Sequence, residues 1–349
     1  MGMHSFTAFF KKNGLRVAVS VVLVVVSTWY AVKDVHFTEL LDALHDVKYI
    51  WVLASAPVIL FSHWLRALRW KTMLEPVLKT KSLHNLFSAV MIGYFANNIL
   101  PKGGEILRPL VFSKREGAPF SSVMATIFIE RLIFDMIPVV LFISGAFLFQ
   151  SKEISIAYPE LGLGFLGSLT ALITCAATVM IVLSAFPQWS EKILDKTVKK
   201  FSEKLYGKLH GIATSFSKGF AILTTPSQYL RVSIESLLIW FVYIIPMWML
   251  FYAFPFGAAK SPGFEDAALI FVIGLISQFA PVPGGIGVYH TLVATSMVRL
   301  YGLRQEEALA YATVSHGINY LITFVIGSAY FLIENRGNTK LKNEVMSES

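Results

Sequence analysis

Long apolar runs separated by short polar stretches dominate this chain of 349 residues. Each run holds roughly 20 residues, the length that a helix needs to cross about 30 Å of hydrocarbon. The pattern therefore predicts an all-α polytopic membrane protein, with residues 1–349 forming a single transmembrane domain. Six full crossings are expected, at about residues 17–32, 50–66, 121–149, 161–186, 231–255 and 306–333.

Two further apolar segments, 83–112 and 265–300, are interrupted by proline and glycine. The first break contains Asn97, Asn98, Pro101, Gly103 and Gly104, and the second contains Pro281, Pro283, Gly284, Gly285 and Gly287. A continuous helix cannot run through such a stretch, and non-helical backbone survives at membrane depth only inside protein or beside a wet cavity. Each segment therefore predicts a re-entrant hairpin of two half-helices.

The distribution of basic residues predicts the orientation. With both termini in the cytoplasm, 21 of the 30 Lys and Arg residues fall on the cytoplasmic side and 6 on the outer side. This bias follows the positive-inside rule and places the two hairpins on opposite sides of the membrane. Because the basic residues lie between the apolar runs, the net charge of +8 does not indicate nucleic-acid binding.

An internal repeat supports the same layout. Ile92-Gly93 and Gly103-Gly104 recur 181 residues later as Ile273-Gly274 and Gly284-Gly285. We therefore predict an inverted repeat, with repeat 1 at about residues 15–150 and repeat 2 at about 160–334, an architecture of transporters. Residues 187–230 are expected to form an amphipathic helix on the inner leaflet or a solvated linker. The polar tail 335–349 is expected to be disordered.

Ionisable residues inside a membrane are costly and therefore point to function. In the first hairpin, Lys102 and Arg108 accompany the half-helix that follows Gly103-Gly104, and its first N–H groups are expected to be unpaired. A positive helix N-terminus beside two cations suits an anion, and the anion expected here is a phosphate. The alternative is that Glu105 and Arg108, three residues apart, only neutralise each other and brace the hairpin.

The following crossing carries three more charges. Arg131 and Asp135 are four residues apart and can form an ion pair, which leaves Glu130 without an obvious local partner. Glu130 is expected to form an ion pair with Lys102 or Arg108, or to take up a proton. A purely structural ion-pair network is an equally good interpretation.

The second hairpin has no basic residue at its tip, but several of its neighbours can hydrogen-bond a headgroup. Those in the hairpin are Gln278, Tyr289 and His290, and those on the last crossing are His316 and Asn319. His316 is either a packing residue or a proton carrier. Arg66 and Arg69, which follow the second crossing, are either interfacial anchors or ligands for lipid phosphate at the mouth of a groove.

Several motifs are absent from the sequence. It contains no G-x-x-x-x-G-K-[ST] loop, no H-E-x-x-H, no G-x-S-x-G and only one cysteine. These absences argue against ATP hydrolysis and thiolate metal binding, and the sequence predicts no cofactor. A membrane-embedded transferase remains an alternative to a transporter.

The motifs together resemble the flippase-like family, which is similar to the transmembrane region of lysylphosphatidylglycerol synthase. The resemblance covers nearly the whole chain and rests on Asn97 to Arg108, on residues 65–70 and 281–287, and on Glu130-Arg131 with Asp135. It implies a multi-pass protein of the bacterial inner membrane that moves lipids or lipid-linked headgroups. The site residues that it implies are Asn97, Pro101, Gly104, Glu105, Arg108, Glu130, Arg131, Asp135, Gly285 and Gly287.

The chain departs from this family in its chemistry. The aminoacyl-transfer domain of the fused enzymes is not expected here, and His290 occupies a position where the family often has Glu. The expected function is ATP-independent movement of a phospholipid or polyprenyl-linked lipid. The alternatives are a small-anion transporter, a transferase acting on lipid phosphate, and a scaffold for a lipid-synthesis enzyme.

Overall fold

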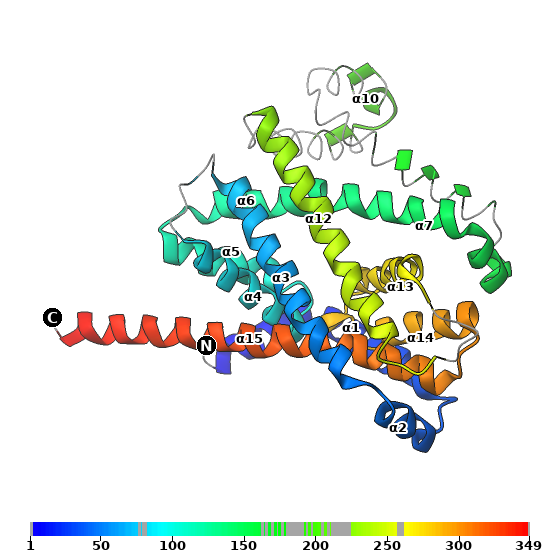
Figure 1. The fold of residues 1–349 in the computed structure, drawn as a ribbon. Coiled ribbons are helices and arrows are strands. Elements are labelled where there is room, and N and C mark those ends of the chain that lie inside the picture. Colours follow the sequence, from blue (N-terminus) through cyan, green and yellow to red (C-terminus); the bar gives the residue numbers. More distant parts are fainter. Residues whose placement is uncertain are drawn as a thin grey trace. The chain divides into compact units, whose positions relative to one another are not determined.

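The computed structural model describes residues 3–75, 78, 82–161, 225–256 and 262–347, with short stretches between residues 164 and 210. These residues form helices and turns without a strand (Figure 1). The first half contains α1 (Met3–Val32), α2 (Phe37–His45), α3 (Tyr49–Leu74), α4 (Leu83–Ile99), α5 (Gly104–Glu116), α6 (Phe120–Ile129), η1 (Glu130–Phe134), α7 (Met136–Ala157) and η2 (Pro159–Leu161). The second contains α10 (Val198–Phe201), α12 (Pro226–Phe251), α13 (Phe264–Ile276), η3 (Ser277–Phe279), η4 (Pro283–Gly285), α14 (Val288–Tyr301) and α15 (Gln305–Ser347).

Three of the described helices are long and apolar enough to cross a membrane. They are α3, α12 and the part of α15 from Gln305 to Glu334. Two bent pairs raise this number to five if each pair is one span: Ala18–Val32 with Phe37–His45, at 83°, and Pro138–Ala146 with Phe149–Ala157, at 68°. The predicted helical membrane protein is confirmed. The expected crossing 161–186 lies largely outside the described residues.

Both broken segments contain interrupted helices, as their Pro and Gly residues predict. The first is α4 and α5, separated by residues 100–103, and the second is α13 and α14, separated by η3, η4 and the residues around them. Lys102 and Gly284 adopt left-handed backbone, with φ of 59° and 58°. These segments are called tip 1 (residues 97–104) and tip 2 (residues 281–287) below. Their re-entry at opposite membrane faces stays a prediction.

The predicted crossing 121–149 differs from a single continuous helix. A π-helical turn, η1, separates α6 from α7, and the N–H of Asp135 bonds the carbonyl of Glu130 at 2.9 Å. Pro138 lacks an N–H donor and its ring crowds the preceding turn, which favours such an irregularity. The backbone is again non-helical at Gln150. Single-turn π-bulges occur often at functional sites.

Other expectations fall on the remaining parts of the chain. The short amphipathic helix α2 lies between the first two crossings, where no element was predicted. The tail expected to be disordered continues α15 as helix to Ser347, since no proline interrupts it. Most of the predicted interfacial region 187–230 lies outside the described residues, apart from α10, a few neighbouring residues and the start of α12.

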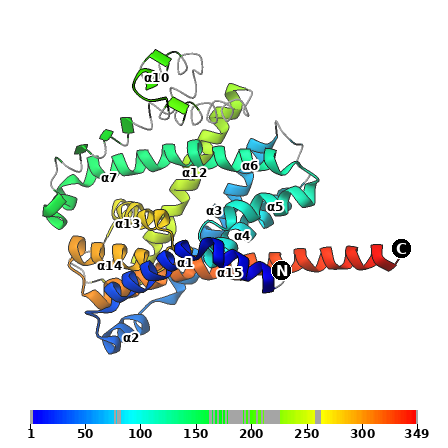
Figure 2. The same cartoon turned by 180° about the vertical axis from the view of Figure 1, so that it is seen from behind.

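The chain divides into two compact units. Unit 1 contains residues 1–61, 90–108 and 242–349, and unit 2 contains residues 62–89 and 109–241. In unit 1, α14 packs against α1, α13 and α15, and both views show α1 beside α14 (Figure 2). Tips 1 and 2 both belong to unit 1. In unit 2, the buried Trp70 ring packs on Phe112 with centroids 4.9 Å apart and donates to Thr126 at 3.0 Å.

One helix start and two contacts recur at the offset of 181 residues that the sequence repeat has. α13 begins 181 residues after α4, at Phe264 and Leu83. Two contacts recur at this offset: Gly93–Arg108 as Gly274–Tyr289, and Arg66–Glu130 as Met247–Tyr311. Within each hairpin, a Cβ built on the first glycine would lie 3.0 Å or less from the matching side chain of the second half-helix.

Candidate functional site

Residues of tip 1 accept the hydrogen bonds of the first N–H groups of α5. The side-chain oxygen of Asn97 accepts a hydrogen bond of 2.8 Å from the N–H of Gly104, the first residue of α5. The next three N–H groups of α5, from Glu105 to Leu107, bond the carbonyl groups of Lys102 and Gly103. The expectation of unpaired N–H groups at this half-helix is therefore wrong, because the chain folds back and supplies the acceptors locally.

The two half-helices of tip 1 approach each other through glycine. A Cβ on Gly104 would lie 2.1 Å from the carbonyl oxygen of Gly93, so only glycine fits at this crossing. Gly93 in turn lies against the Cβ of Arg108, whose side chain is buried. The glycines predicted to allow a tight turn also allow this contact between helices.

The charged residues in tip 1 and at the start of α5 differ in their exposure. The side chains of Lys102 and Glu105 are exposed, and neither forms an ion pair or hydrogen bond with a described residue. Glu105 therefore does not neutralise Arg108, and the expected brace between them is not formed. Pro101 and Gly103 are half-buried in the turn.

Replacing Lys102 by glycine tests the left-handed backbone of tip 1. A residue with a Cβ at φ of 59° costs roughly 1–2 kcal/mol. We expect Lys102→Gly to raise the free energy of unfolding by about 1 kcal/mol, measured by thermal unfolding in detergent. Lys114→Gly, within helical backbone, should lower it by about 1 kcal/mol. Equal losses at both positions would contradict the backbone described for tip 1.

Tip 2 is fixed by the last helix. The Nε2–H of His316 on α15 donates to the carbonyl oxygen of Gly284 at 2.8 Å. Gly285 and Gly287 also have positive φ, of 76° and 81°, and the hydroxyl of Ser277 lies against Gly285. The ring of His290 lies 5.1 Å from that of His316, between centroids. His316 therefore packs against a neighbouring ring, as one interpretation of the sequence expected, and it also hydrogen-bonds the backbone of tip 2.

Tyr289 is buried beside the two histidines. Its ring stacks on His316 at 4.9 Å, and its hydroxyl shares a hydrogen bond of 3.1 Å with Ser315. Gln278 and Asn319 have exposed side chains, while Pro283 lies in the short helix η4. Among the residues predicted around tip 2, His316 therefore contacts three others: Gly284, Tyr289 and His290.

The N-terminus of α14 differs from that of α5. The N–H groups of Gly287, Val288, Tyr289 and His290 make no hydrogen bond to any described residue. No acidic residue lies in the first turn of α14, whereas α5 carries Glu105 there. Four unpaired donors and the positive end of the helix dipole together form a place for an anion.

The two tips meet within unit 1. The hydroxyl of Tyr320 on α15 donates to the carbonyl oxygen of Asn98 at 3.1 Å. A Cβ on Gly284 would lie 3.0 Å from the Tyr320 ring and 3.6 Å from the side-chain oxygen of Asn98. Asn98 in tip 1 and Gly284 in tip 2 are thus neighbours within unit 1.

Unit 2 contains a buried network of charges. The guanidinium of Arg66 lies 2.7 Å from Glu130 and 2.9 Å from Asp135, and that of Arg69 lies 2.9 and 2.7 Å from the same carboxylates. Arg131 joins through Asp135 at 3.3 Å, which confirms the predicted ion pair. Three guanidinium groups therefore share two carboxylates.

Arg66 and Arg69 do not lie as exposed interfacial anchors. Their side chains are 5% and 0% exposed, because the network removes them from the surface. Glu130, which lacked an obvious partner in the sequence, pairs with both. Sequence analysis also missed Ser236, which accepts from Arg69 at 2.9 Å, and Tyr320. The signal for Tyr320 was its position one turn after His316 on an apolar helix.

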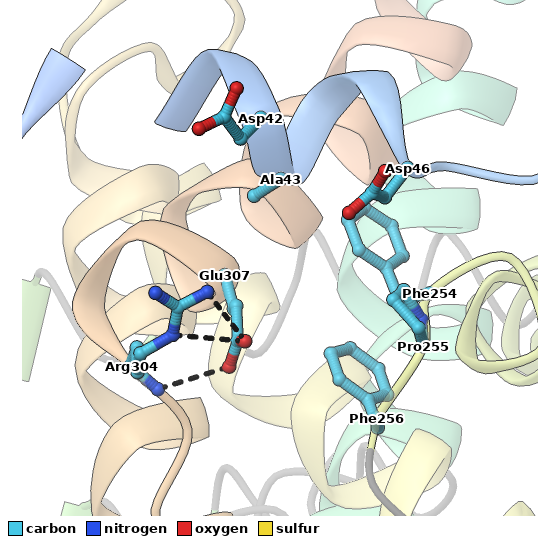
Figure 3. A pocket seen from close by; sticks show the side chains of 8 residues that line it. All are labelled: Asp42, Ala43, Asp46, Phe254, Pro255, Phe256, Arg304 and Glu307. Carbon is cyan, nitrogen blue, oxygen red and sulfur yellow. Dashed lines mark hydrogen bonds and ion pairs between the residues drawn. The ribbon is translucent and has the colours of Figure 1, made fainter. Parts of the chain in front are cut away.

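A small pocket lies elsewhere in unit 1 (Figure 3). Its volume is about 60 Å³, and Arg304 there bonds Glu307 and Glu39. The lining residues are Asp42, Ala43, Asp46, Phe254, Pro255, Phe256, Arg304 and Glu307. The pocket admits a few water molecules rather than a headgroup, and none of the predicted site residues lines it. Among the described residues, no His, Cys, Asp and Glu side chains form a metal site.

The apolar helices, the interrupted segments and the buried polar clusters define a multi-pass helical membrane protein. The chain belongs to the family of the lysylphosphatidylglycerol synthase TM region, which it matches over residues 16–327. The family resemblance read from the motifs is thereby confirmed.

Curated relatives from archaea are similar to this chain over most of its length. A UPF0104 membrane protein of Pyrococcus horikoshii is 24% identical over 339 residues, covering 93% of this chain and 98% of its own. A second, from Methanocaldococcus jannaschii, is 25% identical and covers 84% and 87%. The glycosyltransferase AglD of Haloferax volcanii is 24% identical over 330 residues, which are 85% of this chain and 51% of AglD.

Proposed function

We propose that the chain moves a phospholipid or a lipid-linked headgroup between leaflets without ATP. The headgroup phosphate binds at the N-terminus of α14, beside the meeting point of tips 1 and 2, while the lipid tails stay in the bilayer. The observation that carries this proposal is the set of four unpaired N–H groups from Gly287 to His290. Such groups in a membrane protein are expensive unless a ligand or water satisfies them.

The differences between the two half-helix termini support placing the phosphate at α14. At α5 the donors are already bonded and Glu105 adds a negative charge, so an anion gains little there. At α14 the donors are unpaired and no carboxylate lies in the first turn. Two cations lie in or near tip 1, the exposed Lys102 and the buried Arg108, and both would add to the attraction of unit 1 for an anion.

The recurrence of contacts at an offset of 181 residues supports an inverted repeat. In such transporters, broken helices meet near the midplane, and one repeat rocks against the other around a fixed site. Arg66–Glu130 and Met247–Tyr311 occupy matching positions, so the same contact is ionic in one repeat and neutral in the other. The site would then face each side of the membrane in turn, with both termini in the cytoplasm.

Relatives suggest a second candidate, a role in headgroup chemistry. AglD is a glycosyltransferase, and the similarity to this chain covers about half of it. The family takes its name from the membrane region of an enzyme that makes a lipid. The same fold can therefore act beside a lipid-synthesis enzyme as its partner or scaffold, or carry out transfer on a lipid phosphate. Lipid movement explains the unpaired donors without requiring a catalytic base.

Leaflet exchange in liposomes tests the proposal. Purified chain should increase the exchange of headgroup-labelled phospholipid at least tenfold over protein-free liposomes. A panel should include anionic, zwitterionic and polyprenyl-phosphate lipids. Competition by soluble phosphoesters would indicate a small-anion transporter instead. Chemical change of the lipid after incubation, seen by mass spectrometry, would indicate a transferase. Background exchange with every lipid would contradict lipid movement.

A further inference from the structure

Three polar side chains form a stripe on α15. His316, Tyr320 and Thr323 are spaced by four and three residues, so they share one face of the helix. Thr323 is 1% exposed, which places its hydroxyl away from lipid. All three hydrogen-bond residues of the tips, His316 to Gly284 in tip 2 and both Tyr320 and Thr323 to Asn98 in tip 1.

The stripe holds both tips. His316 bonds the carbonyl of Gly284 in tip 2 at 2.8 Å, and the hydroxyl of Tyr320 bonds the carbonyl of Asn98 in tip 1 at 3.1 Å. The side-chain amide of Asn98 returns two hydrogen bonds, to the Thr323 hydroxyl at 2.9 Å and to the Tyr320 carbonyl at 3.3 Å. One helix face therefore satisfies the polar groups of both tips.

These contacts have a direct mechanical consequence. The carbonyl of Gly284 lies in non-helical backbone and that of Asn98 lies at the end of α4, and both need partners where water is scarce. Each hydrogen bond contributes little net stability, but a set that shares neighbours acts cooperatively. A small number of weak bonds can therefore hold the tips together and still release them.

We propose that His316, Tyr320 and Thr323 are positioning residues that form an α15 clamp. The clamp holds Asn98 and Gly284 together beside the N-terminus of α14, and it opens each time a headgroup passes. This inference rests on the proposed function and deepens it, because it names the contact that controls access to the same phosphate site. The clamp is separate from the groups that bind the phosphate.

A reversible disulfide tests the opening of the clamp. Cys175 is the only cysteine, so Cys175→Ser gives a cysteine-free background for Asn98→Cys with Thr323→Cys. The side-chain nitrogen of Asn98 and the hydroxyl of Thr323 lie 2.9 Å apart, and thiol counting after oxidation verifies that the disulfide has formed. Oxidation with copper phenanthroline should lower leaflet exchange at least tenfold, and dithiothreitol should restore it. Each single cysteine variant should respond to neither reagent. Unchanged exchange in the oxidised pair would overturn the proposal.

Amide hydrogen exchange tests the clamp without relying on transport. Tyr320→Phe removes the bond to Asn98 and keeps the ring, and peptides covering residues 97–106 should exchange about fivefold faster, the effect of one lost hydrogen bond. Tyr301→Phe is the matched control, because it removes the bond of Tyr301 to Asp266 and leaves the tips intact. Equal rates of amide hydrogen exchange for the 97–106 peptides of Tyr320→Phe and Tyr301→Phe would overturn the clamp. If the wild-type chain moves no lipid, the proposed function fails, and this measurement still decides the clamp.

Discussion

Asp135→Asn should lower the free energy of unfolding by about 3–5 kcal/mol, the cost of breaking a buried ion pair. Asp135 lies within 3.3 Å of three guanidinium groups, and those of Arg66 and Arg69 are buried. Without its charge, the two buried arginines share Glu130 but lose the second carboxylate that each contacts. The loss should appear as a lower midpoint of thermal unfolding in detergent, followed by tryptophan fluorescence.

Two further variants separate charge imbalance from general damage. Adding Arg69→Leu to Asp135→Asn leaves Arg66 and Glu130 as a balanced pair, so the double variant should recover at least half of the loss. Leucine already occupies the position 181 residues later, Leu250. Lys199→Gln breaks an exposed pair with Asp195 and should cost less than about 1 kcal/mol. Additive losses in the double variant would contradict the network.

Gly104→Ala should destabilise the protein by about 3 kcal/mol and reduce leaflet exchange to background. The new Cβ would lie 2.1 Å from the carbonyl oxygen of Gly93, so α4 and α5 must separate. Separation also disturbs the hydrogen bond between Asn97 and Gly104 and moves Asn98 away from Gly284. Both unfolding and exchange are measured on the same purified protein.

Gly145→Ala provides the matched control. Gly145 lies in α7, and a Cβ there meets nothing within 4 Å. Alanine is favoured over glycine within a helix, so this variant should gain up to about 1 kcal/mol and keep its leaflet exchange. If Gly104→Ala were as stable and as active in leaflet exchange as Gly145→Ala, the close crossing of α4 and α5 would be contradicted.

Much of the fold follows from local sequence signals. Proline and paired glycines predicted both helix breaks, and α4 begins at residue 83 as expected. The π-helical turn was missed because apolar residues continue through it on both sides and Pro138 alone does not define the register. The amphipathic helix α2 was missed because its nine residues are too short for a search by membrane-span length.

The candidate site was predictable where its contacts are local. The pair Arg131–Asp135 follows from helical spacing. The pairing of Arg66 and Arg69 with Glu130 joins residues more than 60 positions apart, and no spacing rule reaches so far. Capping of Gly104 by Asn97 depends on the exact path of the turn, so the sequence could not separate the bonded donors of α5 from the unpaired donors of α14.

The most direct test of the account compares Val288→Glu with Val288→Gln in the leaflet-exchange assay. Val288 is the first residue of α14, where a carboxylate favours the helix dipole and occupies the unpaired N–H groups. Val288→Glu should therefore retain its stability and lose at least tenfold in exchange, while the neutral Val288→Gln, of nearly equal size, keeps most of it. Equal exchange by two folded variants would contradict a phosphate site at the N-terminus of α14.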